Sequence, residues 1–120
     1  MQPLIMSFRN AIRGMTVMIQ SERNAKIHIV SATLVVLCGF AFSICSYEWI
    51  AIVFAIGIVL ASEGFNSSIE RLSDVVQPNH DERIRIVKDI AAGSVLLSAI
   101  TSAIIGLIVF LPKLINVLFG

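Results

Sequence analysis

Apolar and polar positions alternate with a helical period near the start of the chain. Between residues 4 and 20, apolar side chains recur at steps of three and four, and arginine and amide side chains lie between them. On an α-helix this spacing collects the apolar side chains on one face. Such a helix suits the headgroup layer of a bilayer, although packing on other protein helices explains the same pattern. We expect an interfacial helix over residues 4–20.

The first long apolar stretch covers residues 27–47. Its only ionisable side chains are His28 and Tyr47. Because about 20 apolar residues cross the ~30 Å hydrocarbon core of a bilayer, we expect this stretch to span the membrane. A short turn is expected at residues 46–49, where two aromatic side chains of the kind found at membrane interfaces follow one another.

Two further spans follow from the same pattern. Residues 49–62 carry no charge, but this stretch alone is too short to cross a bilayer. Apolar residues keep a helical spacing beyond it, so the helix is expected to continue. The pattern predicts a helix over residues 49–76 with a polar extension, ended by Pro78. The third helix is expected over residues 82–111, with charged first turns and then an uncharged stretch.

Composition agrees with a membrane protein and excludes other classes. Hydrophobic residues make up 57% of the chain and charged residues 14%, whereas soluble domains average about 45–50% and about 25%. The net charge of +1 gives no reason to expect a nucleic-acid partner. We therefore predict a single all-α membrane domain over residues 1–120, with the lipid bilayer as its surroundings.

The distribution of positive charge predicts the orientation of the spans. Eight of the nine Lys and Arg residues precede the first span or lie between the second and third, and only Lys113 lies near the C-terminus. Loops rich in Lys and Arg stay in the cytoplasm. We expect the N-terminus and the connection around residues 77–81 to be cytoplasmic and the C-terminus to be outside.

The candidate chemistry begins on the second predicted span. Glu63, Asn66 and Glu70 stand at i, i+3 and i+7, so they share one helix face, and Ser67 lies beside them. Glu63 directly follows the uncharged stretch, which puts it near the hydrocarbon boundary. An ionisable residue at that depth is costly and indicates a functional site.

A structural explanation of Glu63 also exists. Its carboxylate would be satisfied by an ion pair with Arg71 or Lys88, or by reaching the interface.

Other polar residues at the same membrane face extend the set. Glu22 precedes the first span, and Lys88 and Asp89 begin the third. Carboxylates suit Mg²⁺ together with phosphate oxygens, and a lysine suits phosphate itself. Taken singly, each is also an ordinary solvated residue at a membrane edge. The chain has no Walker A pattern and no kinase glycine-rich loop.

The run from Glu63 to Glu70, EGFNSSIE, resembles the E-x-x-N-[ST]-[AS]-I-E signature of prokaryotic diacylglycerol kinases and the related undecaprenol kinases. Three further segments resemble this family in the same order between Ser7 and Ile104: Ser7–Gly14, Ser21–Asn24 with His28, and Lys88–Val95. Gly64, Phe65 and Ser94 depart from the usual residues, but none of them removes a candidate catalytic group.

The resemblance implies a homotrimer in the bacterial cytoplasmic (inner) membrane that uses ATP to phosphorylate the hydroxyl of a membrane lipid alcohol. The acceptor is either diacylglycerol, giving phosphatidic acid, or undecaprenol, giving undecaprenyl phosphate. Glu22-Arg23-Asn24 and His28 favour a polyprenol acceptor. By position, Glu63 would be the base and Glu22 and Glu70 would hold Mg²⁺.

The resemblance also implies two wider sets of residues. The ATP site would contain Asn10, Glu22, Glu70, Asn79, His80, Asp81, Lys88 and Asp89. The supporting and substrate-side residues would be Asn66, Ser67, Asn24, His28 and Ala92.

A proton-coupled transporter subunit is the alternative function. A membrane-edge glutamate in a short multispan chain fits that class as well. Transporters, however, keep ionisable groups near the midplane, where both sides reach them, and here almost all of them gather at one face. A purely structural subunit would leave the stripe of Glu63, Asn66 and Glu70 unexplained.

Overall fold

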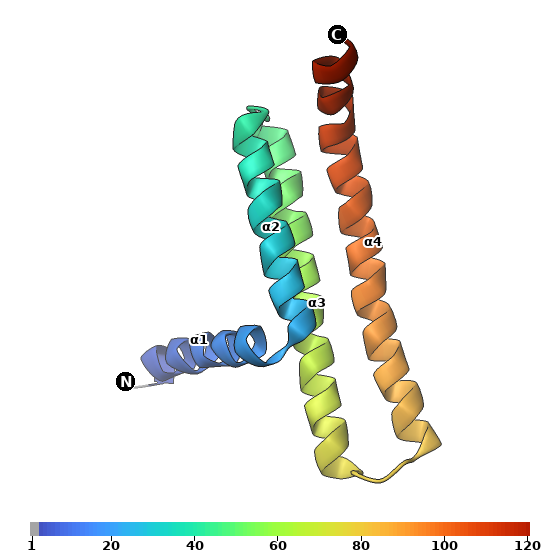
Figure 1. Cartoon of the computed structure of the whole chain (residues 1–120). Helices are drawn as coiled ribbons and strands as arrows, with labels where there is room; N and C mark the ends of the chain where they lie inside the picture. The colour runs from blue at the N-terminus through green and yellow to red at the C-terminus, as the bar shows by residue number, and fades with distance from the viewer. Residues whose placement is uncertain (1–2) are drawn as a thin grey trace.

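The computed structural model describes residues 3–120, and this part of the chain forms four α-helices. They are α1 (Pro3–Ser21), α2 (Arg23–Ala41), α3 (Ser46–Val76) and α4 (Glu82–Phe119). Figure 1 shows α2 and α3 running side by side in opposite directions, α4 returning along α3, and α1 lying across the others. The last three are long and apolar enough to cross a membrane, with mean hydropathies of 1.5, 1.8 and 2.5. The all-α prediction with three membrane-spanning helices is therefore confirmed at this level.

Small polar residues join α3 to α4. The hydroxyls of Ser62 and Ser98 lie 2.7 Å apart, and Ser102 donates a hydrogen bond of 3.0 Å to the carbonyl of Ala55. Small side chains let two helix backbones approach closely, and hydroxyls hydrogen-bond across such interfaces in membranes. The two contacts lie two turns apart or less on each helix, so they fix the register of the pair.

An apolar cluster closes the end of the bundle that carries the α2–α3 turn. Its buried members are Ile44, Ile52 and Val109, from the turn, α3 and α4. Beside them, the ring of Trp49 packs over Gly39, where an added Cβ would come within 2.6 Å of the indole. Gly39 therefore permits the close approach of α2 and α3 at this end.

The turn between α2 and α3 occupies residues 42–45, ahead of the position expected from the apolar pattern. Ser43 has a φ of 51°, which reverses the chain. Cys45 is the N-cap of α3, and its backbone N–H donates to the side chain of Glu48 at 3.0 Å. This capping contact lets α3 begin before Glu48; a pattern of apolar residues alone does not reveal it.

Helix α4 continues past the point where the third span was expected to close. Pro112 lies inside the helix, which runs on to Phe119. A proline removes one backbone donor but leaves its own φ helical, so a helix can continue beyond it at some cost. Lys113 then reaches Glu48 of α3 at 2.8 Å, an ion pair that joins the two helices at this end.

Candidate active site

Helix α3 buries a row of polar side chains on one face. Glu63 has only 1% of its surface exposed, and Asn66 and Ser67 are buried as well. They fall within one and a half turns of each other, so one stripe of the helix carries all three. A buried carboxylate is costly unless partners compensate it, so the partners decide what the row does.

The carboxylate of Glu63 has an incomplete set of partners. Its Oε2 lies 3.5 Å from Nε2 of His28 on α2. Within residues 3–120, neither Oε2 of Glu63 nor Oδ1 of Asn66 has a hydrogen-bond partner, although both atoms are buried. Nearly all buried polar atoms in proteins are hydrogen-bonded, so two free acceptors on one helix face indicate a functional site.

Neither Arg71 nor Lys88 forms the ion pair with Glu63 that would explain this carboxylate as purely structural. Arg71 contacts Glu22, with Nη2 3.7 Å from Oε1, and Lys88 contacts Asp74, with Nζ 2.6 Å from Oδ1. Both cations therefore have other partners, and within residues 3–120 the one ion-pair contact of Glu63 is with His28, which is charged only if protonated.

Glu22 joins this row from a different part of the chain. Its Oε1 accepts a hydrogen bond of 2.8 Å from Ser67. Arg71, one turn further along α3, also donates to the hydroxyl of Ser21 at 2.7 Å. The sequence could not give the distance between Glu22 and α3. Arg71 and Ser21 were missed as site residues, although Arg71 follows Ser67 by four positions and so shares its face.

Glu70 completes a group of three carboxylates. The charges of Glu22 and Glu70 both act on Glu63, and Glu70 is half-buried. Among the described residues, no three His, Cys, Asp or Glu side chains converge tightly enough to hold a metal ion by themselves.

The remaining candidate residues near the α3–α4 connection form a separate group. Asp89 accepts from Arg85 at 2.8 Å, and His80 lies 3.2 Å from Glu82. Asp81 is the N-cap of α4 and accepts from the Arg83 backbone and guanidinium, which lowers the pKa of Asp81 to about 2. These contacts are local to the connection, and no hydrogen bond or ion pair within residues 3–120 joins these candidate ATP residues to Glu63, Asn66 or Ser67.

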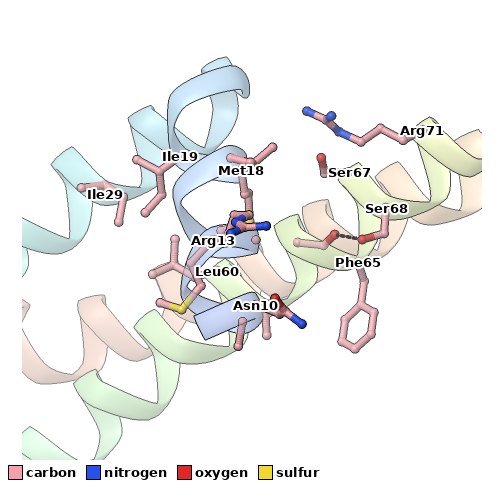
Figure 2. A pocket seen from close by; sticks show the side chains of 16 residues that line it. Asn10, Arg13, Met18, Ile19, Ile29, Leu60, Phe65, Ser67, Ser68 and Arg71 are labelled. Atoms are coloured by element: carbon pink, nitrogen blue, oxygen red, sulfur yellow. Dashed lines mark hydrogen bonds between the residues drawn. The ribbon is translucent and has the colours of Figure 1, made fainter. Parts of the chain in front are cut away.

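Three candidates lie on the surface, namely Asn24, Asn79 and Ala92, and all of them are exposed. Asn10 is also exposed, but it lines a groove between α1, the first turns of α2, and α3. The groove has a volume of about 1100 Å³. Figure 2 shows Asn10, Arg13 and Met18 on α1 at one side of it, and Phe65, Ser68 and Arg71 on α3 at the other. Its apolar lining suits a lipid chain, and its polar side chains suit a headgroup.

Fold and site together define an integral membrane protein in which all acidic residues except Glu48 lie between the middle of α3 and the α3–α4 connection or at the start of α2 and α4. The sequence matches the family model described as prokaryotic diacylglycerol kinase over residues 9–110. It is 39% identical over 108 residues to the undecaprenol kinase of Bacillus subtilis (strain 168), covering 90% of this chain and 88% of that protein. It is 34% identical over 119 residues to the diacylglycerol kinase of Synechocystis sp. (strain ATCC 27184 / PCC 6803 / Kazusa), covering 96% of this chain and 66% of that protein. No solved structure matches the chain significantly.

The chain belongs to the prokaryotic diacylglycerol kinase family and is a lipid kinase of the diacylglycerol or undecaprenol kinase type, with ATP as phosphate donor. The resemblance seen in the sequence is thereby confirmed. The alternative of a proton-coupled transporter subunit receives no support from these comparisons.

Proposed function

We propose that this kinase transfers the γ-phosphoryl group of MgATP to the terminal hydroxyl of a membrane polyprenol such as undecaprenol. The relative that is named an undecaprenol kinase supports this acceptor, because it matches nearly the whole of both chains. The diacylglycerol kinase match extends over only 66% of the longer relative. A polyprenol alcohol offers one hydroxyl and an apolar chain, which agrees with the largely apolar groove beside α3.

Glu63 is the general base in this proposal. The single observation that carries it is the buried Oε2 of Glu63, which has no hydrogen-bond partner within residues 3–120. A base needs a free acceptor within hydrogen-bond reach of the proton that it removes. The lipid hydroxyl gives its proton to Glu63, the lipid oxygen bonds to the γ-phosphorus, and the bond to the β–γ bridging oxygen breaks to release ADP.

Glu22 and Glu70 would bind the Mg²⁺ that accompanies ATP. They fit this role because their charges already act on one point of α3, and because Mg²⁺ needs only one or two carboxylates when phosphates supply other ligands. The bound ion would neutralise charge on the transferring phosphoryl group. Asn66 would orient the carboxylates through the N–H bonds of its amide, while its buried Oδ1, free of partners among the described residues, would accept a hydrogen bond from bound substrate or water.

The nucleotide would extend from this cluster toward the α3–α4 connection. Lys88 and Asp89 would face the phosphates and the ribose, with Asn79, His80 and Asp81 nearby. Lys88 must then exchange its present partner Asp74 for phosphate oxygens. Asn10 would approach ATP from α1, while Asn24, His28, Ser67 and Ala92 would support the lipid side.

We further propose a homotrimer in the bacterial inner membrane, with the N-terminus and the site in the cytoplasm and the C-terminus outside. The Lys and Arg distribution supports this orientation. A neighbouring protomer would bring the α3–α4 connection to the Glu63 row, which the contacts within one chain do not do. The free acceptors on Glu63 and Asn66 are consistent with a site that is completed by substrate and a second copy.

Phosphoryl transfer in lipid vesicles tests the proposed function. Purified protein is reconstituted with ATP labelled at the γ-phosphate, and receives undecaprenol or diacylglycerol in parallel. Undecaprenyl acetate, whose hydroxyl is blocked, is the matched control lipid. We expect label in undecaprenol alone and its loss in Glu63→Gln.

Each other result has a distinct meaning. Label in diacylglycerol alone would keep the kinase and overturn the polyprenol acceptor. Label that persists in Glu63→Gln would overturn the base assignment. No label in either lipid, from protein shown to be folded, would overturn both proposed acceptors.

A further inference from the structure

The elbow between α1 and α2 consists of one residue, Glu22. Its φ of −101° and ψ of 121° are extended, while its neighbours on both sides are helical. The chain changes direction here, so that α1 lies across the bundle (Figure 1). Glu22 is the N-cap of α2, yet its side chain makes no capping hydrogen bond to that helix. It reaches α3 instead.

Two donors on successive turns of α3 hold the elbow. Ser67 donates to Oε1 of Glu22 at 2.8 Å, and Nη2 of Arg71 lies 3.7 Å from the same oxygen. Arg71 also donates to the hydroxyl of Ser21 at 2.7 Å, while that hydroxyl donates its own hydrogen to the carbonyl of Val17. Arg71 therefore contacts the last residue of α1 and the elbow residue together.

Helix α1 has few other attachments. None of the residues in α1 is buried. One of its contacts with α3 is made by Met18, which packs beside Gly64: a Cβ added to Gly64 would lie 3.3 Å from the sulfur of Met18. The rest of α1 forms one wall of the groove (Figure 2). The contacts of Arg71 thus hold a helix that is otherwise loosely packed.

The charges around Glu22 make its position depend on Arg71. The charges of Glu22 and Glu70 both act on Glu63, and like charges at short range repel. The guanidinium of Arg71 offsets this repulsion on the side of Glu22. Both contacts with Glu22 fall on Oε1, so the other oxygen is left for a cation.

We propose that Arg71 is a positioning residue, which fixes the Glu22 carboxylate and the C-terminal end of α1 so that Glu22 can bind the Mg²⁺ of MgATP. The part that concerns Mg²⁺ rests on the proposed function, since it takes Glu22 as a ligand. The part that concerns α1 rests on the contacts alone. Arg71 itself touches neither the lipid hydroxyl nor the phosphates in this account.

Hydrogen exchange tests the contacts of Arg71 without nucleotide. Full-length protein in lipid nanodiscs is compared with Arg71→Gln, Arg71→Lys and Arg23→Gln. Arg23→Gln is the matched control, because Arg23 carries the same charge beside the elbow but makes no ion pair within residues 3–120. We expect amides of residues 17–22 to exchange about tenfold faster in Arg71→Gln, the size expected for loss of a charged hydrogen bond.

A titration with Mg²⁺ tests the link to Glu22. With ATP held constant, we expect Arg71→Gln to need roughly tenfold more Mg²⁺ for half-maximal transfer, Arg71→Lys to lie in between, and Arg23→Gln to match the wild type. Unchanged exchange in Arg71→Gln would overturn the proposal. Faster exchange with an unchanged Mg²⁺ requirement would overturn the positioning of Glu22.

Glu22→Gln separates this proposal from the proposed function. If Glu22→Gln keeps the wild-type Mg²⁺ requirement, Glu22 is not a ligand and that part of the proposed function fails. The exchange rates without nucleotide still report whether Arg71 holds α1.

Discussion

The polar groups in the two halves of the helical bundle differ in whether they have hydrogen-bond partners. At the end with the α2–α3 turn, Glu48 accepts the N–H of Cys45 and pairs with Lys113, and the apolar cluster lies beside them. In the other half of the bundle, beginning at the middle of α3, Glu63 and Asn66 are buried with acceptor atoms that lack hydrogen-bond partners among the described residues. Satisfied polar groups stabilise a fold, and unsatisfied ones cost stability. The comparison indicates that the contacts at the first end hold the helices together, whereas the free acceptors lie where we propose that the substrates bind.

Apart from loss of the base Glu63 itself, the largest expected effect is at Asn66. Asn66→Leu keeps a similar volume and removes a buried acceptor that has no partner in residues 3–120. We expect phosphoryl transfer to fall by about 10² or more, since a group that orients catalytic carboxylates is lost. The thermal unfolding temperature should stay the same or rise, because no hydrogen bond is broken. Loss of transfer together with a lower unfolding temperature would instead indicate a structural role.

Two adjacent serines sharpen the comparison within the active end. Ser67 is buried and donates to Glu22, whereas Ser68 is exposed and donates to the carbonyl of Gly64 in its own helix, as Figure 2 shows. We expect Ser67→Ala to lower kcat/KM for MgATP by roughly tenfold, and Ser68→Ala to leave it unchanged. Equal losses in the two variants would contradict the role given to the contact between Ser67 and Glu22.

Two glycines provide the corresponding test at the opposite end. Gly39→Ala would bring a Cβ within 2.6 to 3.1 Å of three atoms of the Trp49 ring, whereas Gly57 has open space around it. Overpacking of this kind costs about 1–3 kcal/mol. We expect Gly39→Ala to lower the unfolding temperature measured in detergent, and Gly57→Ala to leave it unchanged or raise it. Transfer per folded molecule should be unaffected in both.

The ion pair between Glu48 and Lys113 should show a smaller effect. Lys113→Met removes one partner of a pair that is partly exposed, and such pairs contribute up to about 1 kcal/mol. We expect a slightly lower unfolding temperature and unchanged transfer per folded molecule. A large loss of transfer with a normal unfolding temperature would break the division between the two ends.

The smallest effect concerns pH at the α3–α4 connection. Bonds from Arg83 lower the pKa of Asp81 from 3.8 to about 2. A carboxyl whose pKa is lowered by folding contributes stability above its unfolded pKa and loses that contribution as the pH falls through its folded pKa. We expect the protection of amides 82–85, measured as the exchange rate relative to that of an unfolded chain at the same pH, to be constant above about pH 4 and to fall between about pH 4 and pH 2. A loss of this protection near pH 6 would contradict the prediction.

Much of the fold followed from hydrophobic period and length. The helix expected over residues 4–20 followed from the helical period of its apolar residues. The three later helices followed from apolar stretches whose length matches the thickness of a bilayer. The α2–α3 turn did not follow, because it depends on the cap made by Glu48 and on the left-handed backbone of Ser43. Both are properties of single residues, and the spacing of apolar residues carries no information about them.

The candidate site divides in the same way. The row of Glu63, Asn66 and Ser67 could be predicted, because residues on one helix have a fixed spacing. The approach of Glu22 to Ser67 could not, because it depends on the elbow between two helices. Arg71 was considered only as a partner for Glu63, and its contact with Ser21 and Glu22 depends on the same elbow.

A paired comparison of two glutamates on α3 tests the central claim most directly. Glu63→Gln and Glu48→Gln make the same change in the middle and in the first turn of one helix, and both variants are assayed for label transfer to undecaprenol and for thermal unfolding. We predict that Glu63→Gln abolishes transfer while the unfolding temperature holds or rises, and that Glu48→Gln lowers the unfolding temperature while transfer per folded molecule persists. Transfer that survives in Glu63→Gln, or is abolished in folded Glu48→Gln, would contradict the account.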